Sequence, residues 1–236
     1  MDLLDALLPH LDGAVLDIGA NLGQTLAKIK LADPERAYFG FEPNAVCFHY
    51  LEKLVQANDW RNVELFPIGL SNRSSILKLH TFSDEPTDPL ASFRADFQPR
   101  PAAKRARYAS VFSLDDIDEL TDEKIAVAKI DVEGGEFEAL EGMSACITHK
   151  RPVVILELMQ MPELETQHRR SVQLLNSYGY RLFMIQRDRS RHWTGLDPVT
   201  DYAYTAEPDC DYFLAVPEKL TDLILGLSPD SSGPAI

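Results

Sequence analysis

The chain has 236 residues, of which 45% are hydrophobic, 25% charged and 9% aromatic. This composition is typical of a globular domain and excludes collagen-like and disordered chains. The 37 acidic and 23 basic residues give a formal net charge of −14, and an acidic surface repels phosphate backbones, so we expect no nucleic-acid partner. No apolar run reaches the roughly 20 residues that span a bilayer, so no membrane association is expected.

The chain start and the cysteines indicate the compartment. The first residues have no basic segment and no small-residue cleavage site, so they do not look like a secretory signal peptide. The three cysteines are odd in number and far apart, which argues against a disulfide framework and against a zinc site. We therefore expect a cytoplasmic protein without bound zinc.

Helix and strand patterns alternate over the first part of the chain. Leucines at helical spacing predict a short amphipathic helix within residues 1–12, and an apolar run at 14–18 predicts a buried strand. The next elements expected are a helix from Leu22 to Asp33, a strand at 38–41, a helix at 48–55 and a strand at 63–68. This alternation is typical of β-α-β units.

The alternation is interrupted after residue 70. Residues 75–82 alternate between apolar and polar and predict one arm of a hairpin. Residues 83–108 contain four prolines and five basic residues, a composition that indicates a loop-like insertion. We interpret this insertion as a mobile cover, or lid, over a substrate pocket.

The regular pattern resumes in the second half of the chain. We expect a strand at 125–130, a helix at 137–147, a strand at 153–158, a helix at 164–175, and strands at 180–185 and 212–216. The connection at 194–211 has two equally supported interpretations, a substrate-facing lid and a variable surface loop. Because no clear helix joins the last two strands, one of them is expected to be antiparallel at the sheet edge. Residues 1–217 are thus predicted to form one doubly wound α/β domain with a mostly parallel sheet, followed by a helix and a flexible tail at 218–236.

A glycine turn follows the first strand, in the sequence Val-Leu-Asp-Ile-Gly-Ala-Asn-Leu-Gly-Gln at 15–24. Glycines let the backbone turn tightly and approach a ligand, and ligands of open α/β sheets bind at the carboxyl ends of strands. The Gly-x-x-x-Gly spacing differs from the dinucleotide-binding Gly-x-Gly-x-x-Gly, and the aspartate disfavours a diphosphate. A ligand with an ammonium or sulfonium group fits better. The residues expected to bind it are Asp17, Gly19, Asn21, Gly23 and Gln24.

Glu42 closes the second strand and Asn44 opens the helix after it. An acidic residue at this position can accept hydrogen bonds from both hydroxyls of a ribose that lies across the first turn. The alternative is an ordinary helix cap. Together with the glycine turn, Glu42 and Asn44 favour a nucleoside-containing cofactor.

Carboxylates gather at the ends of the later strands. Asp131, Glu133 and Glu136 surround two glycines after the strand at 125–130, and Glu157 closes the next strand. Like charges are costly to crowd together unless they hold a positive group or share protons. Glu136 in the first turn of a helix is also explained by the helix dipole. The four carboxylates are candidate catalytic residues, and their oxygens also suit a divalent metal such as Mg²⁺.

These motifs together resemble those of the FkbM-type methyltransferases. The resemblance rests on the Asp17 to Gln24 turn, on Glu42-Pro43, on Ser113-Leu-Asp-Asp and on Lys129-Ile-Asp-Val-Glu-Gly through Glu136, and it covers roughly residues 13–217. It implies a Rossmann-like class I methyltransferase fold and S-adenosylmethionine as cofactor. It also implies transfer of a methyl group to a hydroxyl of a sugar, glycolipid or polyketide-type small molecule.

The resemblance implies a role for each candidate residue. Asp17 would face the methionine ammonium, Glu42 would hold the ribose, and Asp131 would lie nearest the reacting methyl. Glu133, Glu136 and Glu157 would supply the base or hold the substrate. Two other functions share the β-α-β plan: a nicotinamide-dependent oxidoreductase, which the missing glycine pattern disfavours, and a non-catalytic cofactor-binding protein, which the crowded carboxylates disfavour.

Overall fold

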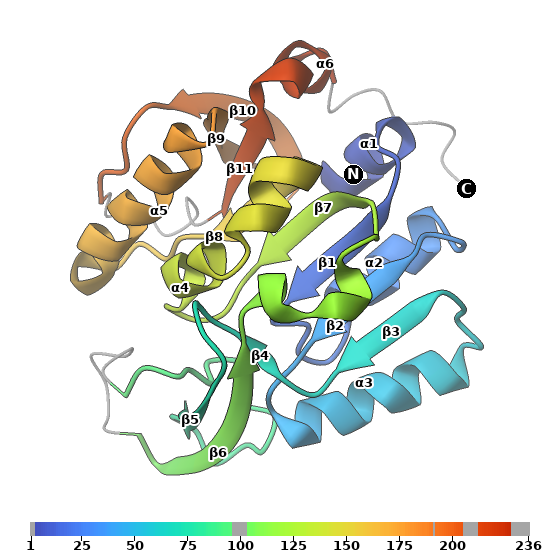
Figure 1. The fold of residues 1–236 in the computed structure, drawn as a ribbon, viewed down its shortest axis with the longest axis vertical. Coiled ribbons are helices and arrows are strands. Elements are labelled where there is room, and N and C mark those ends of the chain that lie inside the picture. The colour runs from blue at the N-terminus through green and yellow to red at the C-terminus, as the bar shows by residue number, and fades with distance from the viewer. Residues whose placement is uncertain (1–2, 96–102, 191, 205–211, 228–236) are drawn as a thin grey trace.

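The computed structural model describes residues 3–95, 103–190, 192–204 and 212–227. Its strands form a main sheet of eight strands and a separate sheet of three (Figure 1). Helices cover both faces of the main sheet, and the small sheet lies beyond one end of it, at the bottom of the view.

The main sheet has the strand order β10-β9-β11-β8-β7-β1-β2-β3. Its strands are β1 (Ala14–Ile18), β2 (Tyr38–Phe41), β3 (Val63–Phe66), β7 (Ile125–Ile130), β8 (Val153–Glu157), β9 (Tyr180–Arg187), β10 (Trp193–Val199) and β11 (Tyr212–Pro217). The five strands from β8 to β3 are parallel, whereas β11 runs antiparallel to β8 and β9, and β10 antiparallel to β9. The predicted fold class, a mostly parallel sheet with an antiparallel edge, is confirmed.

Two hydrophobic clusters hold the layers together. On one face, α1 (Leu3–Leu7), α2 (Gln24–Ala32), α3 (Ala45–Ala57) and α6 (Thr221–Leu225) pack leucines and isoleucines against the sheet. On the other face, α4 (Glu136–Glu141) and α5 (Glu165–Ser177) contribute to the second cluster. Strands such as β1 and β2 are therefore buried along their whole length, which explains why their sequences are continuous apolar runs rather than alternating ones.

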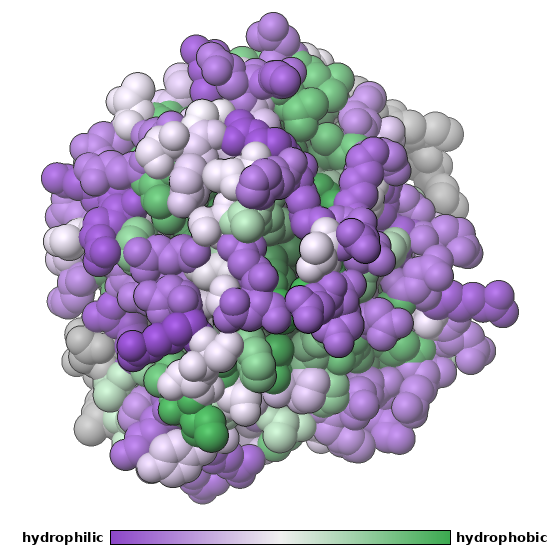
Figure 2. All heavy atoms as spheres, in the orientation of Figure 1, coloured by the Kyte–Doolittle hydropathy of each residue, from purple (hydrophilic) through white to green (hydrophobic). Residues whose placement is uncertain are grey.

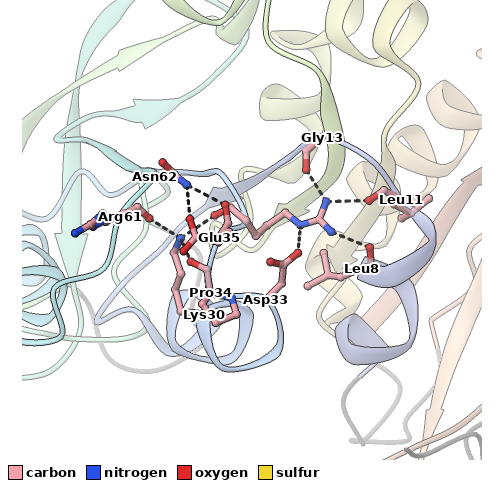
Figure 3. A network of polar contacts seen from close by, with 10 residues as sticks. Leu8, Leu11, Gly13, Lys30, Asp33, Pro34, Glu35, Arg61 and Asn62 are labelled. Atoms are coloured by element: carbon pink, nitrogen blue, oxygen red, sulfur yellow. Dashed lines mark hydrogen bonds and ion pairs between the residues drawn. The ribbon is translucent and has the colours of Figure 1, made fainter.

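The segment between the N-terminal helix and β1 is held by hydrogen bonds to its backbone carbonyls, at Leu8, Leu11 and Gly13 (Figure 3). The Arg36 guanidinium donates to three backbone carbonyls, those of Leu8, Leu11 and Gly13, at 2.8–2.9 Å, and its Nε lies 2.9 Å from the Asp33 carboxylate. Beside it, the Lys30 ammonium donates to three further backbone carbonyls. These hydrogen bonds join the turn after α1, the residue before β1, and the segments that lead into β2 and β3.

The small sheet consists of β4 (Gly69–Leu70), β6 (Arg105–Phe112) and β5 (Ser75–Thr81), in that order. The predicted hairpin arm is confirmed as β5, which pairs antiparallel with β6. The loop predicted over 83–108 ends earlier than expected, because residues 105–108 belong to β6. These four residues are all exposed, so no apolar alternation marked them as a strand. Residues 96–102 of the predicted loop lie outside the described residues.

The chain enters and leaves the small sheet at one place. The backbone N–H of Ser71 donates to the Phe112 carbonyl at 2.8 Å. Gly142, at the end of α4, packs against this junction so closely that a Cβ there would lie 1.9 Å from the Ser71 carbonyl oxygen. Only glycine leaves room for that contact.

The predicted connection at 194–211 contains a strand that the sequence analysis missed. β10 forms the outer edge of the main sheet, and it carries Gly195 and Pro198, residues that are uncommon inside strands and tolerated at an edge. Tyr202, interpreted as part of a lid or of variable surface, is 1% exposed and packs in the core. Residues 205–211 lie outside the described part of the chain.

Hydrophilic side chains cover most of the face seen in Figure 2, and hydrophobic ones show in the hollows between them. Among the residues that the structure describes, no helix is long and apolar enough to cross a membrane.

Candidate functional site

A cavity of about 670 Å³ opens at the edge of the main sheet where β1, β2, β7 and β8 end. This volume lies within the range of small-molecule sites. Of the predicted cofactor-binding residues, those that line the cavity are Gly19, Asn21, Gln24, Glu42, Asn44 and Asp131. Of the predicted catalytic residues, Asp131, Glu133 and Glu157 line it. Asp17, Gly23 and Glu136 lie behind its wall.

The first turn brings β1 and β7 into close contact. Gly19 has a φ of +88°, and a Cβ at this position would lie 1.9 Å from the Asp131 carbonyl oxygen. Any side chain here would push the two strand ends apart. The glycine therefore lets the turn after β1 and the carboxylates after β7 face the same cavity.

Glu42 links the first turn to the second. Its carboxylate accepts hydrogen bonds from the backbone N–H groups of Asn21, at 2.8 Å, and Asn44, at 2.7 Å. The Asn44 side chain in turn accepts from the N–H of Val46 and so caps α3. Burial raises the pKa of Glu42 to about 7, although the two N–H groups act to lower it. Each oxygen keeps a second lone pair for a ligand hydroxyl.

Three carboxylates form one cluster in the cavity, which we call the acidic cluster: Asp131, Glu133 and Glu157. Oxygens of the three lie within 4.8 Å of one another. Glu133 has a φ of +55° and precedes Gly134, which is also left-handed. This turn bends the chain back after β7, so that Glu133 and Asp131 both reach the cavity.

A lysine partly neutralises the acidic cluster. The Lys129 ammonium lies 2.9 Å from an Asp131 carboxylate oxygen and 3.5 Å from one of Asp17. Asp17 is completely buried, and it also accepts a 2.6 Å hydrogen bond from the Tyr38 hydroxyl. The structure thus places Asp17 against Lys129 and Tyr38, where it orients the lysine toward Asp131.

The acidic cluster divides into ionised and protonated members. Burial raises the pKa of Glu133 to about 8 and raises that of Glu157 strongly, and the Asp131 charge adds to both shifts. Burial also acts to raise the pKa of Asp131, but Lys129 and hydrogen bonds from Glu157 and Tyr212 hold it below its usual range. At neutral pH, therefore, Asp131 is ionised and both glutamates are largely protonated.

Glu136 supports the cluster from behind. It is the first residue of α4, as predicted, and one of its oxygens accepts from the N–H groups of Val132, at 3.3 Å, and Gly134, at 3.0 Å. Burial raises its pKa to about 7. Its place is therefore that of a residue that holds the turn carrying Glu133.

The insertion after β5 reaches over the cavity. Asp88, Ala91 and Phe93 line it, and the Ser92 hydroxyl donates to the Glu133 carbonyl at 2.6 Å. The side-chain amide of Asn44 donates to the Pro86 carbonyl at 3.0 Å. The described part of the insertion thus lies against the cavity and is anchored at both turns, and its role as a lid stays a prediction.

Sequence reasoning overlooked three cavity residues: Lys129, Tyr212 and Arg187. Lys129 lies inside a quoted motif, but a lysine within a strand gives no sign of burial beside two aspartates. Tyr212 opens β11, and its hydroxyl donates to Asp131 at 3.2 Å. An antiparallel strand begins at the edge where its parallel neighbours end, so its first residue is a usable signal. Arg187 closes β9 and stacks on the Tyr212 ring at 4.2 Å.

The acidic cluster fits a divalent metal only in part. Its three carboxylates are suitable oxygen ligands, but the Lys129 ammonium already lies 2.9 Å from Asp131. A metal ion would have to displace that ammonium or tolerate its charge.

Comparison with known proteins gives one family. The sequence matches the methyltransferase FkbM domain over residues 17–182. No protein of curated function matches it at a significant level.

Solved methyltransferase structures also match the chain, and one of them has a TM-score above 0.5. Methyltransferase FkbM from Methylobacillus flagellatus is 18% identical with a TM-score of 0.51, over 86% of this chain and 43% of that one. A precorrin-6Y C5,15-methyltransferase from Geobacter metallireducens is 14% identical with a TM-score of 0.49, over 91% of this chain and 84% of that one. A SAM-dependent O-methyltransferase from Thermotoga maritima is 12% identical with a TM-score of 0.45, over 89% and 61%. This chain therefore spans less than half the length of the FkbM structure.

Proposed function

This chain belongs to the FkbM methyltransferase family, and from this premise we propose that it transfers the methyl group of S-adenosylmethionine to a hydroxyl of a small molecule or glycan. The class of acceptor we propose is a sugar, glycolipid or polyketide-type compound. The net charge of −14 supports such an acceptor over a nucleic acid. The observation that carries the proposal is the acidic cluster in the cavity beside the Gly19 turn.

The residues around the cavity fit the proposed cofactor. When bound, S-adenosylmethionine supplies a methyl group on a positively charged sulfur. Glu42 has free lone pairs for ribose hydroxyls, and Gly19, Asn21 and Gln24 of the first turn line the cavity beside it. The ionised Asp131 and the oxygen atoms of Glu133 and Glu157 present a polar wall to the positively charged sulfur.

Deprotonation of the acceptor hydroxyl falls to the acidic cluster. Asp131 is ionised and shares a hydrogen bond with Glu157, so it is able to accept a proton at neutral pH. Lys129 and Tyr212 fix its orientation from two sides. Beyond deprotonation, in-line methyl transfer needs the two reactants to be aligned and water to be excluded. The insertion that carries Asp88 and Phe93 covers the cavity and so contributes to both.

The proposal is tested first by cofactor binding. Trp193 lines the cavity, so its fluorescence should change when S-adenosylhomocysteine binds. We expect saturable binding of S-adenosylhomocysteine and none of NAD⁺ at the same concentrations. Binding of NAD⁺ alone would replace the proposal with the oxidoreductase alternative.

Asp131→Asn tests the chemistry. The substitution keeps the shape of the side chain and removes the proposed base, so methyl transfer from labelled S-adenosylmethionine should fall by about 10²–10⁴-fold. The matched control is Asp222→Asn, at an exposed position on α6, which should retain full activity. A folded Asp131→Asn protein with unchanged turnover and cofactor affinity would remove Asp131 from the proposed site.

A further inference from the structure

Arg187 is a cation in the cavity that the proposed chemistry does not use. It is half-buried at the end of β9 and lines the cavity together with Trp193, its partner in the β9–β10 register. Within the described part of the chain, its guanidinium makes no hydrogen bond or ion pair that would balance its charge. Its one recorded contact is the stacking on the Tyr212 ring.

The carboxylates of Asp188 and Asp131, which lie near Arg187, already bind other groups. The Asp188 carboxylate accepts from the backbone N–H groups of Ser190, at 2.8 Å, and His192, at 2.9 Å. Asp131 is held by Lys129 and Tyr212. A guanidinium that is partly removed from water without an anionic partner is costly, and arginine recognises carboxylate and phosphate through two parallel hydrogen bonds.

The stacking also fixes where an anion would bind. Tyr212 presents the face of its ring to Arg187 and its hydroxyl to Asp131. The tyrosine therefore sets the guanidinium at a constant offset from the proposed base. A molecule bound to both would place one group on Arg187 and another beside Asp131.

We propose that the methyl acceptor carries an anionic group, a carboxylate or a phosphate, and that Arg187 binds this group while the acceptor hydroxyl faces Asp131. This inference rests on the proposed function and narrows its acceptor to acidic molecules, such as a sugar acid or a sugar phosphate. Arg187 is then a specificity residue, and its charge selects acceptors in a cavity otherwise rich in carboxylates.

The experiment compares three probes: glucuronate, glucose 6-phosphate and uncharged glucose. Their binding is measured by the fluorescence of Trp193, with and without saturating S-adenosylhomocysteine, in the full chain. We expect at least one of the two anions to bind about tenfold or more tightly than glucose. The stronger of the two identifies the carboxylate or the phosphate as the preferred group.

Variants assign the effect to the arginine. Arg187→Met keeps the length of the side chain and removes its charge, so the preference for the anion should disappear. Arg187→Lys should keep part of it, since lysine retains the charge without the planar donor pair. The control is Arg181→Met, an exposed arginine of the same strand, which should bind all three probes as the unmodified chain does.

The inference would be overturned by no preference for either anion in the unmodified chain, or by the same preference in Arg187→Met. A loss of S-adenosylhomocysteine affinity in Arg187→Met would also overturn it, because the arginine would then bind the cofactor. The proposed function fails separately, if S-adenosylhomocysteine does not bind the unmodified chain.

Discussion

Glu42 shows how one side chain serves both the fold and the ligand. Its two carboxylate oxygens accept backbone hydrogen bonds from two different turns, at Asn21 and at Asn44. The same oxygens face the cavity. The helix-cap and ligand-binding interpretations that the sequence left open for this residue are therefore compatible.

We expect Glu42→Gln to weaken binding of S-adenosylhomocysteine by about ten- to a hundredfold, the range for losing hydrogen bonds to a charged group. Glutamine keeps one acceptor oxygen but turns an N–H₂ group toward one of the two backbone donors. Calorimetric titration of the folded variant measures the loss. Glu52→Gln, at an exposed position on α3, is the control, and equal affinities of the two variants would contradict the assignment.

At the residue scale, the sequence predicted strand-end positions well and side-chain partners poorly. Asp131, Glu133 and Glu157 were expected at one edge of the sheet, and the register of parallel strands brings them there. Asp17 was expected to face the ligand, yet its carboxylate is turned toward Lys129 and Tyr38. Spacing along the chain determines which strand end a residue occupies, whereas the partner of a buried charge depends on residues far away in sequence.

At the scale of a single element, the Asp88 carboxylate holds the insertion between β5 and β6 in place. The Asp88 carboxylate accepts hydrogen bonds from the N–H groups of Phe82, at 2.6 Å, Ser83, at 2.8 Å, and Leu90, at 3.1 Å. Burial acts to raise its pKa, but these N–H groups hold the pKa below its usual range. A buried, ionised side chain thus replaces regular secondary structure in ordering this segment.

Asp88→Asn should loosen the insertion, because an amide offers one acceptor oxygen where the carboxylate offers two. We expect turnover to fall by roughly tenfold and cofactor affinity to change much less, if the segment covers the acceptor as we propose. Hydrogen exchange at 82–95 should become faster. Asp84→Asn, which removes only an exposed pair with Lys104, is the control. Unchanged exchange and turnover in Asp88→Asn would show that the insertion is not a cover.

Elements with apolar runs could be predicted from the sequence, and those with mixed composition could not. β1, β7 and β8 are buried on both faces and were found from their hydrophobicity alone. β6 and β10 were missed because edge positions and small sheets expose most of their side chains. Their strand conformation comes from pairing with β5 and β9, which no local pattern records.

For the molecule as a whole, buried carboxyl groups link stability to pH. Burial raises the pKa of Glu133 to about 8 and those of Glu42 and Glu136 to about 7, from an ordinary value of 4.5. Between pH 4.5 and these raised pKa values, the folded state binds more protons than the unfolded state. The free energy of unfolding therefore falls as pH rises through this range. Below pH 4.5 these three groups no longer change it.

The ligand-free chain should therefore be less stable at pH 8.5 than at pH 6, by roughly 5 kcal/mol for these three groups. Urea unfolding at the two pH values measures the difference. Glu133→Gln removes one titrating group and should reduce the difference, whereas Glu123→Gln, at an exposed position, should leave it unchanged. A free energy of unfolding that is constant or rises with pH would contradict the raised pKa values.

The junction of Ser71 and Phe112 has a consequence for how such a protein can diversify. Because Ser71 is hydrogen-bonded to Phe112 beside Gly142, directly after the pairing of β4 with β6, residues 72–111 form a cassette whose two ends are adjacent. Recombination between relatives could exchange this cassette while the turns after β1 and β2 stay intact. New acceptors would then be acquired by exchanging one segment, while the residues that we propose to bind the cofactor stay unchanged.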